Sequence, residues 1–536
     1  MNDPAPLWLG AAAFAFLLAA VVSVPLSALV LRRYRAAVQR GMSGGRGRQE
    51  RDPEETSGPR PSLGITTSSA SVEGGPLYRV ARGRRRAQLL ATVAGALAFA
   101  ATGTALVRHY ESETFTTGPR LLILFLVLAW PVVPEVWRQI GLSRAEAAGV
   151  LFAWATTVAL VGGPDASTYL VVWGSMGLLP TLVFLGLAGG QRRAVAPWVF
   201  LPLAAGTFGF GAAVEPVSRL LTTPLPDAGV ALVLGGLVAL ALVGLAAGAA
   251  ALPLVTLGFR RRAFSDVALA GMSWWLFFTL WTALFWTWSG VPILAWAGPL
   301  LLRSGVVLVT RRLLRPRSEL HSTGALLLRV FGQRQRTERF FAVLTDTWRF
   351  AGPVRLIGGT DLAQATLEPH ELLDHLTRRG DEGFVTSTET LEAALGELDD
   401  GCFPDGRFPV QEIYSDGDHW QAAVRGLMVR SDVVVMDLRS FDGTPGCAWE
   451  LRALVDLVPT ERLVLLVGES EELVRTHLVQ SWESMAPGSP NRAGTHRTIE
   501  LHRIEGSRAD ARDTVARMTA AAQGVSGGAS GSSVRA

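Results

Sequence analysis

The sequence predicts a bundle of transmembrane helices followed by an α/β domain with a parallel sheet, on three observations. Hydrophobic residues make up 49% of the 536 residues, and the mean hydropathy of +0.29 is high for a soluble chain of this size. Between residues 88 and 311, apolar segments long enough to cross a bilayer follow one another with short, mostly arginine-bearing breaks. Beyond residue 323, short all-apolar runs alternate with amphipathic stretches, which is typical of strands buried on both faces of a parallel sheet.

The first apolar run covers residues 7–31 and is closed by three arginines. Its start carries Asp3 and no positive charge, and the run is longer than the apolar part of a signal peptide. We therefore expect a retained transmembrane helix in residues 1–35, with the N-terminus outside. Residues 36–87 lack apolar periodicity and are rich in Gly, Ser, Pro, Arg and Glu, so we expect a disordered, basic cytoplasmic loop.

Eight further spans are predicted in a membrane domain of residues 88–315. They cover residues 89–107, 121–137, 145–161, 168–188, 195–214, 229–257, 267–288 and 291–309. Nine spans place the two termini on opposite sides, and the loops assigned to the inside carry most of the arginines. The sequence thus predicts a multi-pass protein of the cell membrane, with the lipid bilayer as partner and the C-terminal domain in the cytoplasm.

Composition excludes several classes of function. The net charge of +4 could suggest nucleic acid, but the arginines gather at segment ends, which is a topological pattern, so no nucleic-acid partner is expected. All 50 basic residues are arginine. Without lysine there is no ordinary P-loop, protein-kinase or Schiff-base chemistry. Cys402 and Cys447 form no metal-ligand pair, and His370 and His375 are five residues apart instead of four, so no metal site is expected.

Transport is an alternative function for the membrane domain. The candidate ionisable residues for such a pathway are Glu135, Glu215 and Arg303, and each can be read as lying near a helix end. Pro131 and Pro134 break the span at residues 121–137, and broken helices line the sites of some transporters. A transporter with a regulatory domain therefore stands beside a structural or sensing bundle.

The α/β domain is predicted over residues 323–523, followed by a disordered Gly/Ser-rich tail at 524–536. Strands are expected at residues 325–331, 354–357, 433–438, 463–467 and 498–504. Helices are expected at 334–350, 368–379, 388–399, 420–429, 447–457 and 509–522, with an extended loop at 400–419.

The stretch SDVVVMDLRSFDGTPGCAWEL, which begins at Ser431, carries the candidate chemistry. Its predicted strand ends in Asp437, the following turn offers Ser440, and a Thr-Pro pair then starts a helix. Cys447 and Glu450 are three residues apart and share one face of that helix. Functional groups of parallel sheets gather beyond the carboxyl ends of the strands, where this turn is expected to lie.

This stretch resembles the Toll/interleukin-1 receptor (TIR) domain, whose pattern here is Ser, then Trp-Cys, two residues and Glu-Leu. The resemblance implies a flavodoxin-like fold. It also implies one of two activities: cleavage of the nicotinamide glycosidic bond of NAD by the Glu that corresponds to Glu450, or assembly by self-association without catalysis. The stretch is also similar to nucleoside deoxyribosyltransferases, in which such a Glu is the nucleophile at an N-glycosidic bond. Both resemblances assign the chemistry to Glu450.

The resemblance implies a site for a nucleotide, with NAD as substrate and no cofactor. A carboxylate at Glu450 would stabilise or capture an oxocarbenium-like species. The residues expected to line the site are Arg329, Gly332, Gly358, Asp361, Asp437, Ser440 and Cys447. A Glu near the N-terminus of an amphipathic helix is otherwise a solvated residue favoured by the helix dipole. The functions open at this point are a signalling or NAD-cleaving domain, a non-enzymatic interaction or sensor module, and a regulated transporter.

Overall fold

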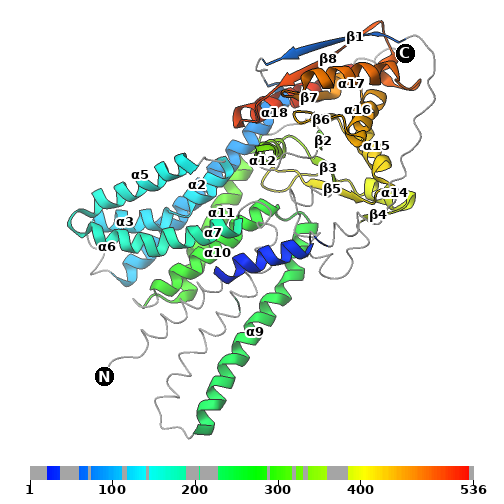
Figure 1. Ribbon diagram of the computed structural model, residues 1–536. Helices are drawn as coiled ribbons and strands as arrows, with labels where there is room; N and C mark the ends of the chain where they lie inside the picture. Colours follow the sequence, from blue (N-terminus) through cyan, green and yellow to red (C-terminus); the bar gives the residue numbers. More distant parts are fainter. Residues whose placement is uncertain are drawn as a thin grey trace, which may run out of the picture. The chain divides into compact units, whose positions relative to one another are not determined.

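The computed structural model describes residues 21–34, 36, 60–69, 74–111, 118–140, 144–188, 205, 227–286, 290–316, 322–329, 336–358 and 384–529. The chain divides into two compact units (Figure 1). The helical unit comprises Met1–Arg33 and Arg86–Arg315, and the sheet unit comprises Tyr34–Arg85 and Pro316–Ala536. Helix α2 (Pro76–Tyr110) belongs to both, because the division falls between Arg85 and Arg86.

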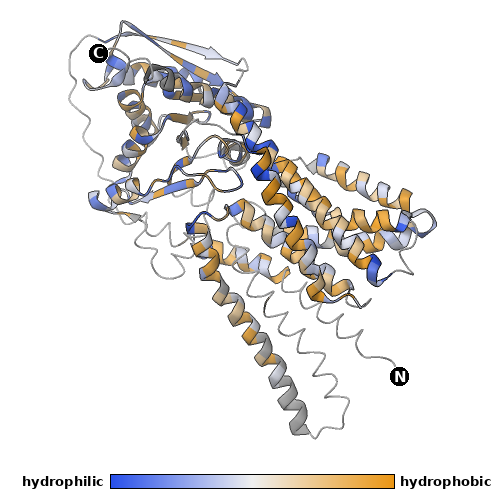
Figure 2. Cartoon of the chain, turned by 180° about the vertical axis from the view of Figure 1, so that it is seen from behind, coloured by the Kyte–Doolittle hydropathy of each residue, from blue (hydrophilic) through white to orange (hydrophobic). Residues whose placement is uncertain are grey.

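The helical unit contains apolar helices joined by short segments. After α2 come α3 (Gly118–Ala129), α4 (Val132–Ile140), α5 (Arg144–Gly162), α6 (Ala166–Trp173), a π-helical segment (Gly174–Leu178), α7 (Leu179–Ala188), α9 (Asp227–Arg260), α10 (Asp266–Trp286), a 3₁₀ turn (Ile293–Trp296) and α11 (Ala297–Leu314). Among the described residues, five helices are long and apolar enough to cross a membrane: Pro76–Tyr110, Glu146–Leu182, Leu242–Arg260, Asp266–Trp286 and Ile293–Leu314. Figure 2 shows the predominance of hydrophobic residues in these helices.

The predicted spans agree with these helices in most places. The expected span at 121–137 is divided into α3 and α4 at the Trp130–Pro131 turn, where proline removes a backbone donor. The span at 168–188 is helical but contains the π-helical segment. The span at 195–214 and the first part of the span at 7–31 lie outside the described residues.

Aromatic side chains fill the core of the helical unit. The ring of Phe99 on α2 lies 5.1 Å from that of Trp275 and 6.2 Å from that of Trp296, within the range of favourable aromatic pairs. Large apolar side chains also point outward, including Phe152 at 75% exposure and Leu294 at 86%. An apolar exterior around a packed aromatic core is unusual for a surface in water.

The sheet unit is built on one eight-stranded sheet in the order β1-β8-β7-β6-β2-β3-β5-β4, in which every neighbouring pair is parallel. The strands are β1 (Ser62–Ser68), β2 (Ala325–Arg329), β3 (Val354–Gly358), β4 (Phe384–Val385), β5 (Val410–Ser415), β6 (Val433–Asp437), β7 (Leu463–Val467) and β8 (His496–Arg503). The predicted parallel sheet is confirmed. In the sheet, β2 lies between β3 and β6, and β7 and β8 follow on the far side of β6.

Helices cover both faces of this sheet. Leu326, Leu328, Val434 and Met436 belong to one core, which also takes in residues of α14 (Thr388–Gly396), α15 (Trp420–Arg430), α16 (Pro445–Leu457) and α17 (Glu471–Glu483). The alternate residues of the same strands belong to a second core with α12 (Arg336–Trp348), α18 (Arg508–Ala529) and the first turns of α2. Two covered faces explain why these strands are apolar throughout.

Three boundary predictions in the sheet unit are wrong. The loop predicted at 36–87 contains β1, which pairs with β8, and the start of α2. Hydrogen bonds from residues far away in the sequence stabilise β1. Trp482 Nε1 donates to Pro61 O at 2.8 Å, and Arg475 Nη1 donates to Ile65 O at 3.1 Å. The extended loop predicted at 400–419 contains β5, and α18 continues to Ala529 past the predicted start of the tail. The helix expected at 368–379 lies outside the described residues.

Candidate functional site

The candidate site lies where the chain leaves β2 and β6 in opposite directions across the sheet. From β2 the chain proceeds to β3 on one side, and from β6 it proceeds to β7 on the other. Ligands of open α/β sheets bind at the carboxyl ends of the strands at such a switch point. The parallel register pairs Arg329 with Asp437, the last residues of these two strands. The fold therefore brings together two predicted site residues that are far apart in the sequence.

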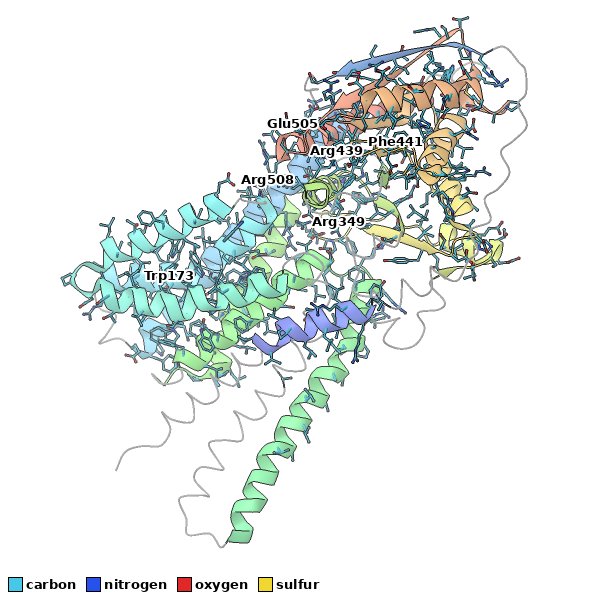
Figure 3. All side chains as sticks on the ribbon, in the orientation of Figure 1. Trp173, Arg349, Arg439, Phe441, Glu505 and Arg508 are labelled. Carbon is cyan, nitrogen blue, oxygen red and sulfur yellow. The ribbon has the colours of Figure 1, made fainter. Side chains whose placement is uncertain are left out.

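The carboxylate of Asp437 is already engaged by an arginine that the sequence analysis missed. Arg439 donates from Nε to Asp437 Oδ1 at 2.8 Å and from Nη2 to Oδ2 at 2.7 Å, and its guanidinium carbon lies 4.6 Å from the centre of the Phe340 ring (Figure 3 labels Arg439). Both partners are largely buried. This bidentate ion pair compensates the charge of Asp437 and fixes its side chain in the turn, so its carboxylate is not free to bind a ligand.

The turn after β6 is held rigidly. Ser470 Oγ donates to the carbonyl oxygens of Leu438 at 3.0 Å and Arg439 at 3.3 Å. Phe441 is buried, and its ring lies 5.1 Å from that of His477. Gly443 has a φ of +74°, a backbone conformation that favours glycine. These contacts fix the start of α16 and leave Ser440 half-buried within the turn.

Glu450 is buried on the face of α16 that packs on the sheet. It shares this stripe with Cys447, Leu451 and Leu454, which all belong to the same core of the sheet unit. The residue is only 5% exposed, and its Oε2 atom has no hydrogen-bond partner. The alternative of a solvated surface residue is therefore wrong for Glu450.

Burial raises the pKa of Glu450 from 4.5 to about 8. Desolvation is the cause of this rise, because burial penalises the ionised form of the carboxyl. At neutral pH the side chain is mainly a neutral carboxylic acid, which ionises when a positive charge approaches. A strongly shifted carboxyl on the helix that follows β6 has the properties of a functional group.

The remaining predicted site residues are not all brought together. Gly358 ends β3 opposite Tyr414, and a Cβ atom on this glycine would lie 2.4 Å from Tyr414 Cδ1, so the tyrosine ring fills that space. Cys447 is a buried cysteine outside any disulfide, one turn before Glu450. Gly332, Asp361 and the side chain of Arg329 lie outside what the structure describes.

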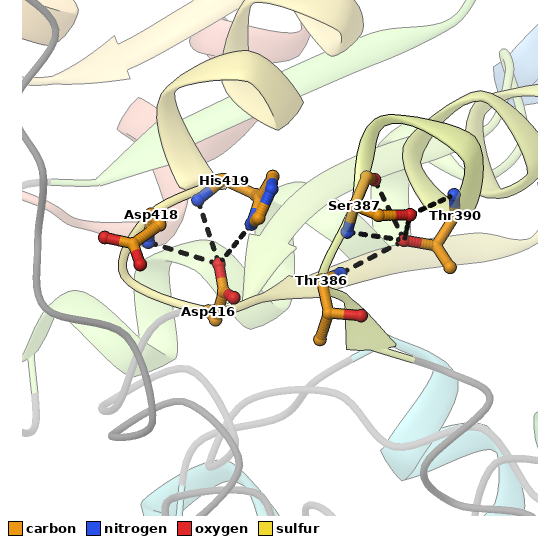
Figure 4. A network of polar contacts seen from close by, with 6 residues as sticks. All are labelled: Thr386, Ser387, Thr390, Asp416, Asp418 and His419. Carbon is orange, nitrogen blue, oxygen red and sulfur yellow. Dashed lines mark hydrogen bonds and ion pairs between the residues drawn. The ribbon is translucent and has the colours of Figure 1, made fainter.

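A second polar group lies at the ends of β4 and β5 (Figure 4). Asp416 Oδ1 accepts from the backbone N–H groups of Asp418 at 3.1 Å and His419 at 2.9 Å, and lies 2.7 Å from His419 Nδ1. Ser387 and Thr390 form a capping box at the start of α14. These contacts organise a turn and a helix start.

No protein-family model, curated protein or solved structure matches the chain. We therefore infer the function from the residues and geometry of the chain itself.

The Asp437–Arg439 pair yields a first prediction. Replacing Arg439 by alanine is expected to lower the free energy of unfolding of the sheet unit by about 3 kcal/mol, because a buried carboxylate loses its counter-ion. Chemical unfolding of the full-length protein in detergent measures the change. The double variant D437N/R439Q removes both charges and should recover part of the loss. Equal stability of R439A and the unchanged protein would show that the pair is solvated.

Proposed function

We propose that the chain is an integral membrane protein whose cytoplasmic, TIR-like α/β domain cleaves the N-glycosidic bond of NAD or a related nucleotide with Glu450. The observation that supports this function best is the buried carboxyl of Glu450, without a hydrogen-bond partner at Oε2, on the helix that follows β6. Burial of an uncompensated carboxyl is costly and contributes nothing to packing that an apolar side chain would not supply.

Two features of the helical unit support membrane insertion. Five described helices are long and apolar enough to span a bilayer. The unit also presents outward side chains such as Phe152, Leu160 and Leu294, which suit contact with acyl chains and not with water. The arginine-bearing loops predict that the sheet unit is on the cytoplasmic side.

The proposed reaction uses the neutral resting state of Glu450. The nicotinamide ring of NAD is cationic, and its approach favours ionisation of the carboxyl. As the bond between ribose C1′ and the pyridinium nitrogen breaks, the bond electrons neutralise the leaving ring and the ribose becomes oxocarbenium-like. The Glu450 carboxylate then stabilises this positive charge, water attacks C1′, and a proton from the water passes to the carboxylate or to solvent.

Nicotinamide release from NAD tests the proposal with full-length protein in lipid nanodiscs. The Glu450→Gln variant keeps the size of the side chain and removes its charge, so the rate is expected to fall about 100-fold or more. Glu472→Gln, an exposed position in the first turn of α17, is the matched control and should keep full activity. Absence of release, or equal rates for the unchanged protein and E450Q, would overturn the proposed activity.

A non-enzymatic interaction module is the second candidate. It is favoured by the closure around Glu450, because the carboxyl shares a core stripe with Leu451 and Leu454 and a substrate must displace packed side chains to reach it. In that case the full-length protein self-associates in nanodiscs or detergent, E450Q self-associates equally, and neither releases nicotinamide. Cross-linking with mass analysis distinguishes the two candidates.

A further inference from the structure

The helical unit contains a buried ion pair that the proposed function does not use. Glu135 on α4 and Arg303 on α11 have 11% and 8% side-chain exposure, and Arg303 Nη2 lies 3.4 Å from Glu135 Oε2. Trp275 on α10 donates from Nε1 to the same oxygen at 2.7 Å. The Arg303 guanidinium carbon also lies 4.2 Å from the centre of the Trp275 ring. Three helices thus meet at one carboxylate.

Arg303 and its neighbour Trp275 lie far from the ends of two apolar helices, whereas Glu135 lies in the first turn of the short helix α4. Arg303 stands halfway along the apolar stretch Ile293–Leu314, and Trp275 stands near the middle of Asp266–Trp286. The expected position of Arg303 near a helix end is therefore wrong. Ionisable residues at this depth of a membrane helix are costly and mark ion and proton pathways.

The contact between the two charged groups is long for a buried ion pair. In addition, Arg303 Nε has no hydrogen-bond partner. The other carboxylate oxygen, Glu135 Oε1, lies against Gly271, where an added Cβ would come within 3.0 Å of it. The shortest hydrogen bond to Glu135 is donated by the neutral indole of Trp275. A protonated carboxyl can still accept this hydrogen bond through its carbonyl oxygen. Protonation can therefore release Arg303 without removing the main contact.

Buried polar side chains lead from the arginine-rich end of α2 toward this carboxylate. Gln88, which is 4% exposed and whose Oε1 has no hydrogen-bond partner, lies one turn before Thr92 on α2. Gln139 Nε2 donates to Thr92 Oγ1 at 3.3 Å, and Gln139 lies one turn after Glu135 on α4. These uncharged polar side chains lie one turn apart along α2 and one turn from Glu135 along α4.

Two irregular helical segments lie beside the pair. The α3–α4 break frees the carbonyl of Pro131, which accepts from Trp274 Nε1 at 3.0 Å. The π-helical segment Gly174–Leu178 packs on the same break, because a Cβ on Gly177 would lie 3.0 Å from Trp130 Cδ1, and the rings of Trp130 and Trp173 are 5.1 Å apart (Figure 3 labels Trp173). Broken helices and π-helical turns recur at functional sites of helical proteins.

We propose that Glu135 is a proton-binding site inside the helical unit, with Arg303 as the counter-ion that protonation releases. The ligand is a proton because Glu135 Oε2 already faces the Arg303 guanidinium, and the described residues contain no group of three or more His, Cys, Asp or Glu side chains that could hold a metal ion. Uptake converts the carboxylate to a carboxylic acid and leaves the Arg303 charge uncompensated. Among the described residues, the charged neighbour of Glu135 is Arg303, which in turn interacts electrostatically with Arg311. The other neighbouring side chains are uncharged: Trp275 on α10, Thr92 on α2 and Gln139 on α4.

Infrared difference spectroscopy of the full-length protein in nanodiscs tests this site. In the Glu450→Gln background, which removes the carbonyl band of the buried Glu450 acid, lowering the pH is expected to produce a carbonyl band from a buried carboxylic acid, and the further change Glu135→Gln should abolish that band. Arg303→Gln should raise the midpoint pH of the band by about 1 to 3 units, because the carboxylate loses its counter-ion. Glu146→Gln, at an exposed position in the first turn of α5, is the control and should leave both band and midpoint unchanged.

The Trp275→Phe variant provides a second test that retains both charges. Loss of the indole donor should raise the midpoint pH of the band by less than Arg303→Gln does. This test does not require that the E135Q variant folds. In the Glu450→Gln background, a band that persists after Glu135→Gln would belong to another carboxyl, and absence of any band across the pH range in which the protein stays folded would show a permanently ionised pair. Either outcome overturns the proposal. These outcomes do not depend on nicotinamide release, so the site and the proposed enzymatic function can fail separately.

Discussion

Between pH 5 and pH 8, the protein is expected to lose about 4 kcal/mol of unfolding free energy relative to its Glu450→Gln variant. The cause is the buried carboxyl of Glu450, whose pKa burial raises to about 8 in the folded state. Glutamine at this position has no ionisation, so its contribution to stability does not change with pH. Comparing slopes avoids the separate, pH-independent cost of burying the amide.

The sign follows from the protons bound in each state. Below about pH 4.5, Glu450 is protonated in both the folded and the unfolded chain and contributes no slope. Between there and about pH 8 the unfolded chain has released the proton while the folded chain retains it, so stability falls as pH rises. Above that range both states are ionised, and the slope due to this residue ends.

Chemical unfolding of the two full-length proteins at a series of pH values measures the difference. Glu472→Gln, which changes an exposed carboxyl, should follow the pH profile of the unchanged protein. Parallel profiles for the unchanged protein and E450Q would mean that Glu450 is solvated or paired in solution, and they would also remove the main support for its catalytic role.

The central strands were predictable because their signal is local. Strand β6 (Val433–Asp437) is buried at all five positions, which only a sheet covered on both faces permits. Strand β1 (Ser62–Ser68) has no comparable signal, since its hydroxyl-rich sequence is held by hydrogen bonds from residues more than 400 positions away. Edge strands of this kind depend on tertiary contacts that periodicity does not contain.

The candidate site was predictable in position but not in chemical state. Turn residues and the spacing of Cys447 and Glu450 located the helix face, and the neighbouring Leu451 and Leu454 continue that face at helical spacing. This spacing was a usable signal for the burial of Glu450. The sequence did not predict that Arg439 pairs with Asp437, because an arginine two residues away can equally point to solvent. Only the fold shows that Glu135 and Arg303 meet across 168 residues.

The close approach of two backbone segments before β2 and β3 gives the last prediction. Gly352 is buried, and a Cβ atom added to it would lie 1.8 Å from the carbonyl oxygen of Thr323. The obstacle is backbone that leads directly into β2, so it cannot move aside as a flexible side chain can. Gly352→Ala is therefore expected to lower the free energy of unfolding of the sheet unit by about 4 kcal/mol, through displacement of β2 against β3.

The same substitution at Gly446 should have the opposite effect. Gly446 lies in the first turn of α16, and an added Cβ there meets no atom within 4 Å, so alanine gains helix propensity of up to about 1 kcal/mol. Chemical unfolding of the two full-length variants compares them under one condition. If G352A were as stable as G446A, the segments before β2 and β3 would have to be farther apart than the parallel pairing of Ala325 with Val354 allows. The switch point, at which the chain leaves β2 and β6 in opposite directions across the sheet, depends on that pairing.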